Sequence, residues 1–158
     1  MGHPKKQRRK YERPKRPYDK ERIEKEKALL KEFGLRRKNE IWRAESILRN
    51  FRRRARDLQA KEDEKKTKEL MGKLGVLGLL SEKSGLEDVL GLKIEDVLSR
   101  RLQTLVHKKG VTAKHARQLI VHGHVKIDDR KARWPSYLVP VKMESKIMLN
   151  LKKEVESA

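Results

Sequence analysis

The sequence predicts an α+β protein, in which a mainly helical N-terminal region precedes a small domain of two helices and an antiparallel sheet. Two patterns lead to this class. Before Gly123, apolar residues recur at steps of three and four, the period of helices that face a core. After Gly123, apolar and polar residues alternate in short runs between turn residues, which is typical of strands. We divide the chain into a basic extended arm (1–18), a helical domain (19–93) and the two-helix and sheet domain (94–158).

The composition allows only a modest core. Of the 158 residues, 35% are hydrophobic and 42% are charged, against roughly 45–50% apolar residues in an average globular chain. We therefore expect part of the chain to become ordered against a partner. The absence of cysteine excludes disulfides, thiol catalysis and cysteine-based zinc sites.

The charge is unevenly distributed and indicates a polyanionic partner. The formal net charge is +20, with 22 basic against 8 acidic residues in 1–56, 7 against 10 in 57–99, and 14 against 5 in 100–158. Two basic blocks around an acidic one predict two contact surfaces. The longest apolar run, 75–80, is too short to cross a membrane, and no apolar segment follows the basic N-terminus as it would in a signal peptide. We expect a cytoplasmic protein with no membrane partner.

The N-terminal arm and the first helix are predicted from local signals. Residues 1–18 are rich in Lys, Arg and Pro, and they suit either a solubilising tail or a basic arm that orders on phosphates. We favour the arm. Asp19 is a plausible N-cap for a helix that runs to Phe33, and Gly34 is suited to end it.

A second helix is expected from about residue 38 to residue 60. Its apolar stripe comprises Ile41, Ala44, Leu48, Phe51, Ala55 and Leu58. Trp42 flanks the stripe, where packing is favoured over stacking on a base. Close-set arginines repel one another unless phosphates neutralise them, so we predict that an arginine-rich face of this helix contacts RNA. The predicted RNA-binding residues are Arg49, Arg52, Arg53, Arg54 and Arg56.

The middle region carries weaker signals. Residues 61–68 suit a helix extension or a linker. Glycines at steps of three in 72–78 lack the Gly-Lys-Ser/Thr ending of a phosphate loop, so close packing or termination of a short helix is expected. Ser84 and Ile94 are candidate starts for further helices, and we expect this acidic region to pack the two halves of the chain together.

Two helices and a sheet are expected in the last third. A helix from about Ile94 places its apolar residues on one face, with Arg100, Gln103 and His107 on the other, and Gly110 ends it. Thr112 then caps a helix that ends at Gly123. Its inward residues are Ala116, Leu119 and Ile120, and its outward residues are Lys114, Arg117, Gln118 and Val121.

A hairpin and a final strand complete this domain. Residues 125–127 and 130–132 flank the turn Asp128-Asp129, and Ile147, Leu149 and Leu151 alternate in the last strand. The basic residues collect on the helix side, which predicts a docking surface for phosphates with a helix N-terminus near Thr112.

The segment "RRLQTLVHKKGVTAKHARQLIVHGHVKIDD", followed by "WPSYLV", resembles the S-four RNA-binding domain. Together with "GLEDVLGLKIEDVLSRRLQT" and "RRKNEIWR", it is similar to the small-subunit ribosomal protein S-four family of the archaeal and eukaryotic type. The resemblance implies a structural protein of the small ribosomal subunit that binds small-subunit rRNA at a junction of the 5′ domain. It further implies a part in subunit assembly, in decoding fidelity, and a place near the entrance of the mRNA channel.

The resemblance also implies particular RNA contacts, made largely to backbone, shape and 2′-hydroxyls. The implied residues are Arg100, Arg101, Lys114, His115, Arg117, Gln118, His122, His124 and Lys126, to which we add Lys108 and Lys109. Two positions depart from the family pattern: many S-four domains have Asp where this chain has Gln103, and Asp128-Asp129 replaces the common Asn-Gly turn. The zinc-binding cysteines of some bacterial relatives are absent.

Other functions remain open at this point. An rRNA-processing factor of the same architecture, or an accessory to an RNA-modifying enzyme, would share the chemistry, but no motif for catalysis, for a cofactor or for a metal is present. His122 and His124 alone do not complete a metal site, so we expect one to pack and the other to contact RNA. Trp134 and Tyr137 are expected to pack against the helices rather than stack on bases. The expected partners are small-subunit rRNA, neighbouring ribosomal proteins and mRNA, with no homo-oligomer.

Overall fold

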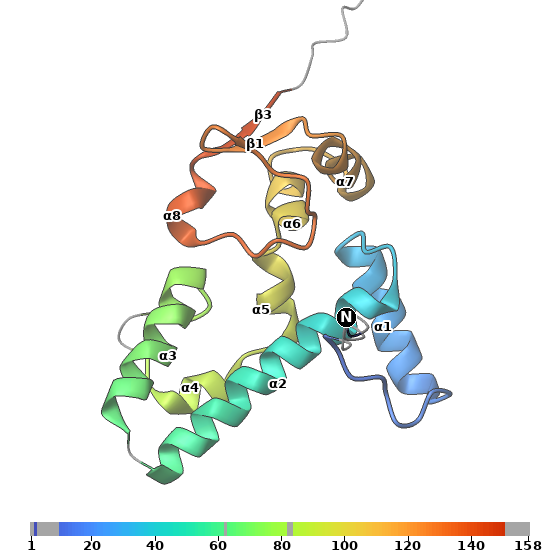
Figure 1. Cartoon of the computed structure of the whole chain (residues 1–158). Coiled ribbons are helices and arrows are strands. Elements are labelled where there is room, and N and C mark those ends of the chain that lie inside the picture. Colours follow the sequence, from blue (N-terminus) through green and yellow to red (C-terminus); the bar gives the residue numbers. More distant parts are fainter. Residues whose placement is uncertain (1, 3–9, 62, 82–83, 151–158) are drawn as a thin grey trace, which may run out of the picture.

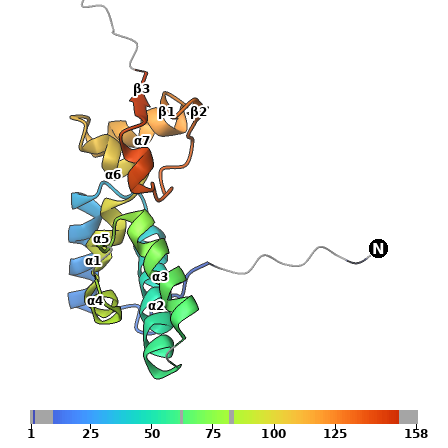
Figure 2. The same ribbon diagram turned by 90° about the vertical axis from the view of Figure 1, so that its left-hand side faces the viewer.

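The computed structural model describes residues 2, 10–61, 63–81 and 84–150, and its elements form two units. The first consists of helices α1 (Lys20–Glu32), α2 (Lys38–Lys61), α3 (Glu64–Leu77), α4 (Leu86–Gly91) and α5 (Ile94–Ser99). The second consists of α6 (Leu102–His107), α7 (Ala113–Val121), β1 (Val125–Ile127), β2 (Arg130–Lys131), α8 (Val141–Glu144) and β3 (Ile147–Leu149). Figures 1 and 2 show the sheet unit above the helical unit, and α5 connects the two. The α+β class is confirmed.

Each unit has its own hydrophobic core. The core of the helical unit is built on the apolar stripe of α2, where Ala55 is fully buried, and extends to Leu74, Val89 and Leu98. The core of the sheet unit lies between α6, α7 and the sheet, and it includes Leu102. The change from one core to the other falls between residues 98 and 102.

Helix α2 is the longest element of the helical unit, and the others pack along it (Figure 1). Its stripe is buried as expected, apart from the half-buried Phe51. Trp42 packs as expected, because its Nε1 donates to Glu26 Oε1 at 3.0 Å and its ring lies 5.9 Å from that of Tyr11. Residues 1 and 3–9 of the predicted arm lie outside the described residues.

The acidic middle region packs against α2 within the helical unit and also contacts the sheet unit. Helices α4 and α5 lie against α2, and each is capped by a carboxylate three residues into the helix, since Asp88 accepts from Gly85 N–H and Asp96 from Lys93 N–H. Gly78 ends α3 in a left-handed conformation beside Val141 of α8. The sheet unit and the helical unit are therefore in contact at α3 as well as through α5.

The sheet unit matches most of its predicted local structure. Thr112 caps α7 by accepting from His115 N–H, and Ala116, Leu119 and Ile120 point inward. The three strands are antiparallel in the order β2-β1-β3, and the turn between β1 and β2 places Asp128 at φ 58°. Leu151, expected at the end of the last strand, lies outside the described residues.

The prediction of one helix from Ile94 to about His107 is wrong. The chain bends at Arg100 and Arg101, where Arg101 forms a β-bridge with Leu138. Val139 N–H donates to Arg100 O at 3.0 Å, and Leu102 N–H donates to Tyr137 O at 2.8 Å. Backbone groups at the bend thus form hydrogen bonds with the segment 137–139 in place of those that a continuous helix would make.

Candidate nucleic-acid interface

The outer side of α7 presents a polar surface fixed by a buried inner side. Ala116 and Ile120 are fully buried, so the rotation of the helix is set by the core. The residues exposed on the outer side, which we call the α7 surface, are Lys114, His115, Gln118 and His122. Val121, also exposed, borders them as expected. None of the four has an ion-pair partner among the described residues, so their charges and hydrogen-bonding groups face solvent.

A second group of polar residues lies between the two units. This Glu40 cluster consists of Glu40 from the start of α2, Arg101 and Gln103 from the start of α6, and Arg117 from α7. Glu40 accepts from Arg117 Nη2 at 2.9 Å and also from Arg101. Gln103 Oε1 accepts from Arg117 Nη1 at 3.2 Å, and its Nε2 donates to Gly34 O at 2.8 Å and Ala113 O at 3.0 Å. The cluster therefore ties the α1–α2 turn to both helices of the sheet unit.

The electrostatics of the Glu40 cluster favour an ionised carboxylate. Burial raises the pKa of Glu40, but hydrogen bonds and positive charge from Arg117 and Arg101 outweigh burial and hold that pKa below its ordinary value of 4.5. The side chain of Arg101 is only 5% exposed, so Glu40 is the counter-charge that makes its burial tolerable.

Several of the predicted RNA-binding residues are engaged in contacts within the chain. Arg101 is buried and bound to Glu40, so it is not available to a phosphate unless that pair breaks. Arg100 donates to Glu144 at 2.7 Å and to Val139 O, which leaves its side chain 13% exposed. Arg117, predicted to face outward, is held against Glu40. Gln103 is buried rather than outward.

Other predicted contacts remain at the surface beside α7. Lys108 and Lys109 are exposed in the α6–α7 turn, although Lys109 Nζ also donates to Ile147 O. His124 is exposed and Lys126 is half-buried on β1. His122 and His124 are both exposed, so the expectation that one of them packs in the core is wrong; their ring centroids lie 6.5 Å apart.

The predicted arginines of α2 separate into two groups. Arg49, Arg52, Arg53 and Arg56 follow helical spacing and form what we call the α2 arginine face. Arg54 instead lines a hollow against α3 with Lys66. Of the α2 arginine face, Arg52 is half-buried and donates to Leu92 O, while Arg53 is 77% exposed.

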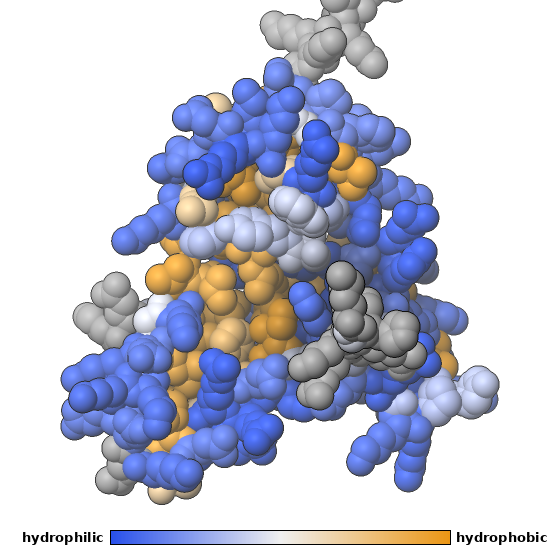
Figure 3. Space-filling model, viewed as in Figure 1, coloured by the Kyte–Doolittle hydropathy of each residue, from blue (hydrophilic) through white to orange (hydrophobic). Residues whose placement is uncertain are grey.

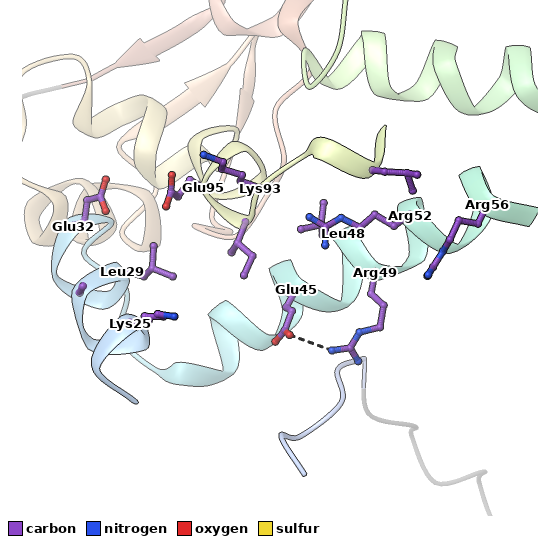
Figure 4. Close-up of a pocket in the computed structure, with 13 residues that line it drawn as sticks. Lys25, Leu29, Glu32, Glu45, Leu48, Arg49, Arg52, Arg56, Lys93 and Glu95 are labelled. Carbon is purple, nitrogen blue, oxygen red and sulfur yellow. Dashed lines mark hydrogen bonds and ion pairs between the residues drawn. The ribbon is translucent and has the colours of Figure 1, made fainter. Parts of the chain in front are cut away.

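The α2 arginine face borders an open groove of about 870 Å³ between α1, α2 and the α4–α5 region. Figure 4 shows Arg49, Arg52 and Arg56 projecting from α2, with Arg49 joined to Glu45. Acidic side chains, including Glu32 and Glu95, also line the groove. This groove is of mixed charge, unlike the α7 surface.

The aromatic residues after the hairpin do not pack as expected. Trp134 is 71% exposed and Tyr137 is 42% exposed. Figure 3 shows hydrophobic residues gathered across the middle of one face, between hydrophilic regions above and below.

Within the described part of the chain, no three potential metal ligands come together, and no helix has the length and apolar character needed to cross a membrane.

Comparison with known proteins agrees with this geometry. A family model described as S4 domain matches residues 100–145. A protein named small ribosomal subunit protein uS4 from Methanothermobacter thermautotrophicus is 46% identical over 100% of this chain and 98% of its own length. Proteins of the same name from Picrophilus torridus and Methanosphaerula palustris are 50% and 45% identical over 95% and 93% of the chain, and the matches cover 86% and 87% of their lengths. The chain belongs to the uS4 family.

In this uS4 chain, the matched S4 domain begins at the bend between α5 and α6. That point is where the hydrophobic core changes from the helical unit to the sheet unit. The S4 domain therefore contains the whole α7 surface, three of the four residues of the Glu40 cluster, and the exposed Trp134.

Sequence reasoning missed the role of Glu40 in this uS4 chain. The residue sits in a polar stretch one position before the apolar stripe of α2, and its partners Arg101 and Arg117 are 61 and 77 residues away. A single unpaired carboxylate among "RRKNEIWR" was the one available signal, because every other charge in that stretch is positive.

Proposed function

We propose that the chain is a structural, non-catalytic constituent of the small ribosomal subunit and that it binds small-subunit rRNA in the cytoplasm. The observation that carries the proposal is the match to proteins named small ribosomal subunit protein uS4 over at least 86% of their lengths. The S4 domain and the positive charge of +20 support the same conclusion.

The α7 surface supports a contact with the backbone of helical RNA. Lys114 supplies a free charge for phosphate, and Gln118 supplies both a donor and an acceptor that suit 2′-hydroxyls. The capped N-terminus of α7 follows the turn that contains Lys108 and Lys109, so the helix end and the two lysines bring positive charge to the same end of the helix. Such contacts position the protein on RNA by shape rather than by base sequence.

We further propose that the protein binds at a junction of the 5′ domain, next to other small-subunit proteins and near the entrance of the mRNA channel. Support comes from the two separate basic regions, the α7 surface on the S4 domain and the α2 arginine face on the helical unit. A protein with two basic regions held in one orientation by the Glu40 cluster can fix the angle between two RNA helices. That property would serve subunit assembly and decoding fidelity.

Two paired variants test the proposal. The first replaces the exposed Lys108 and Lys114 by Ala, and the control replaces Lys65 and Lys68 on α3, which are also exposed. Both variants lose the same charge. Binding to the 5′ domain of small-subunit rRNA is measured with excess tRNA as competitor over a salt series. We expect the first variant to bind about tenfold or more weakly, with a salt slope lower by about one per lost contact, and the control to bind nearly as the parent does.

Equal losses in the two variants would mean that net charge alone is felt, and would remove the α7 surface from the proposal. If tRNA competes with the 5′ domain for the parent chain as effectively as it competes for a general polycation, the rRNA assignment itself is contradicted. Unchanged circular dichroism in both variants is the control for folding, since all four lysines are exposed.

A further inference from the structure

A hollow beside the hairpin combines exposed aromatic residues with basic ones. It has a volume of about 420 Å³ and is lined by Ile127, Arg130, Lys131, Trp134, Tyr137 and Met143. This volume falls in the range of roughly 300–1,000 Å³ that is usual for small-molecule pockets. We call it the Trp134 hollow. It lies outside the α7 surface and the α2 arginine face.

The wall that carries Trp134 is held rigidly although its side chains are exposed. Tyr137 N–H donates to Trp134 O at 3.1 Å, which closes a turn. Both sides of the turn are then bound to the start of α6, where Leu102 N–H donates to Tyr137 O at 2.8 Å and Gln103 N–H donates to Pro135 O at 3.3 Å. In Figure 1 this segment is part of the orange loop between the hairpin and α8. Because the backbone that carries the ring is already fixed, less conformational entropy is lost when a ligand binds against the ring.

The core does not account for Trp134. The indole is 71% exposed, while the core of the sheet unit is already filled by residues such as Leu102, Val125 and Val139, all fully buried. An indole that large, held in place yet mostly in water, leaves a flat apolar face for a partner.

The charges around the hollow select the kind of partner. Arg130 and Lys131 are both exposed on β2, and among the described residues neither lies within ion-pair distance of a carboxylate. Asp128, the acidic residue of the lining, is paired with Lys146 at 3.2 Å. The hollow therefore offers aromatic and apolar walls next to free positive charge. Unpaired nucleotides combine a flat base with a phosphate, and aromatic side chains with nearby cations are what bind them in single-stranded RNA.

We propose that the Trp134 hollow binds an unpaired nucleotide of RNA, with its base stacked on Trp134 and its phosphates near Arg130 and Lys131. The inference deepens the proposed function and rests on it in one respect, that the partner is RNA. It adds a contact to single-stranded RNA to the helical contact of the α7 surface. The two contacts differ chemically, because stacking requires a base and the α7 surface requires only backbone.

The test uses the two tryptophans of the chain as separate reporters. Trp42→Phe leaves Trp134 as the one tryptophan, and Trp134→Phe leaves the half-buried Trp42 as the matched control. Each full-length variant is titrated at moderate salt with oligoadenylate of about eight nucleotides, within the usual site size, and with an abasic oligomer of the same length. We expect oligoadenylate to quench Trp134 and the abasic oligomer to leave it nearly unchanged, since only the first can stack. Trp42 should respond to neither.

Truncation then measures the contribution of stacking. Trp134→Ala in the full chain should weaken oligoadenylate binding about tenfold, and Trp134→Phe should restore most of it, as base–aromatic stacking predicts. Because the ring is exposed, neither variant should change the unfolding midpoint. If Trp42→Phe does not fold, ¹⁹F NMR of the parent chain labelled with fluorotryptophan resolves the two rings and gives the same comparison.

The proposal is overturned by quenching of equal size with the abasic oligomer, which would reduce the contact to phosphate attraction. It is equally overturned if Trp134 stays unquenched at oligoadenylate concentrations that saturate the chain. Should its emission then shift to the blue with RNA-free small-subunit proteins, the hollow is a protein contact instead. Loss of oligoadenylate quenching with intact binding to the 5′ domain rejects this inference alone, whereas loss of binding to the 5′ domain rejects the proposed function.

Discussion

The α7 surface and the Glu40 cluster contain the same types of side chain, yet they are built for opposite purposes. Lys114 and Gln118 point into solvent, while Arg101 and Gln103 are bound on the inside by Glu40 and by backbone carbonyls. Charge in the first region is left without a partner, whereas the arginines of the second are paired with Glu40. A basic residue in an RNA-binding chain therefore contributes either to the contact or to the frame that orients it.

The largest expected effect comes from removing the centre of the Glu40 cluster. Glu40→Ala leaves Arg101 buried without its counter-charge and frees Arg117, which should lower the free energy of unfolding by about 3–5 kcal/mol. Urea unfolding measures the loss. The control is Glu45→Ala on the same helix, since the pair of Glu45 with Arg49 is half-exposed and should contribute about 0.5 kcal/mol or less. Equal effects from the two variants would contradict the distinction between charged residues that hold the two units together and charged residues that only face solvent.

A smaller effect is expected where Gly34, between α1 and α2, lies against Ala113 at the start of α7. Gly34 has φ +58°, and a Cβ placed there would lie 2.3 Å from Ala113 Cβ. Gly34→Ala therefore adds a steric clash to the strain of a left-handed residue, and should destabilise the fold by about 2–4 kcal/mol in urea unfolding. Gly110→Ala is the control, because Gly110 has φ +93° and no atom within 4 Å of its added Cβ. It should cost about 1–2 kcal/mol, and a larger loss at Gly110 would contradict the close approach at Gly34.

The contrast also explains which parts of the fold were predictable. Helix α7 was predicted well because Thr112, the apolar positions of the helix and Gly123 are all local signals. The same holds for α2, whose stripe persists over several turns and allows one choice of buried face. The exposed α7 surface follows from these signals, since a helix with one buried side must expose the other.

The bend at Arg101 and the contacts of the Glu40 cluster were not predictable, because the residues that determine them are distant in sequence. The bend at Arg101 depends on Leu138, and a local reading of 94–107 sees only continuous helical spacing. Gln103 has the period of an outward residue, but Gly34 O and Ala113 O supply the partners that allow its burial. For Trp134 the error is the reverse, because a residue expected to be buried is exposed. Its apolar character predicts burial, and nothing nearby in the sequence shows that the core is already filled.

The pH dependence of the Glu40 cluster tests the same carboxylate charge in the parent chain. The folded state lowers the pKa of Glu40 below 4.5, so between the folded and unfolded pKa values the unfolded chain binds more protons at this residue. The stabilisation is complete above about pH 4.5 and is lost as the pH falls through the lowered pKa. Glu40→Gln keeps the shape without the titration. Urea midpoints of the parent chain and Glu40→Gln should therefore differ by a constant amount from pH 7 to about 5 and converge below that range.

The convergence separates charge from shape within the Glu40 cluster. If Arg101 and Arg117 hold Glu40 by charge, protonating the carboxylate makes the parent chain equivalent to the Gln variant, and the two acid curves meet. A gap that persists through the most acidic pH at which both chains fold would mean that packing alone distinguishes them. Glu45→Gln is the matched control at the surface, and its urea midpoints should stay close to those of the parent, because the pair of Glu45 with Arg49 is half-exposed and screened by solvent.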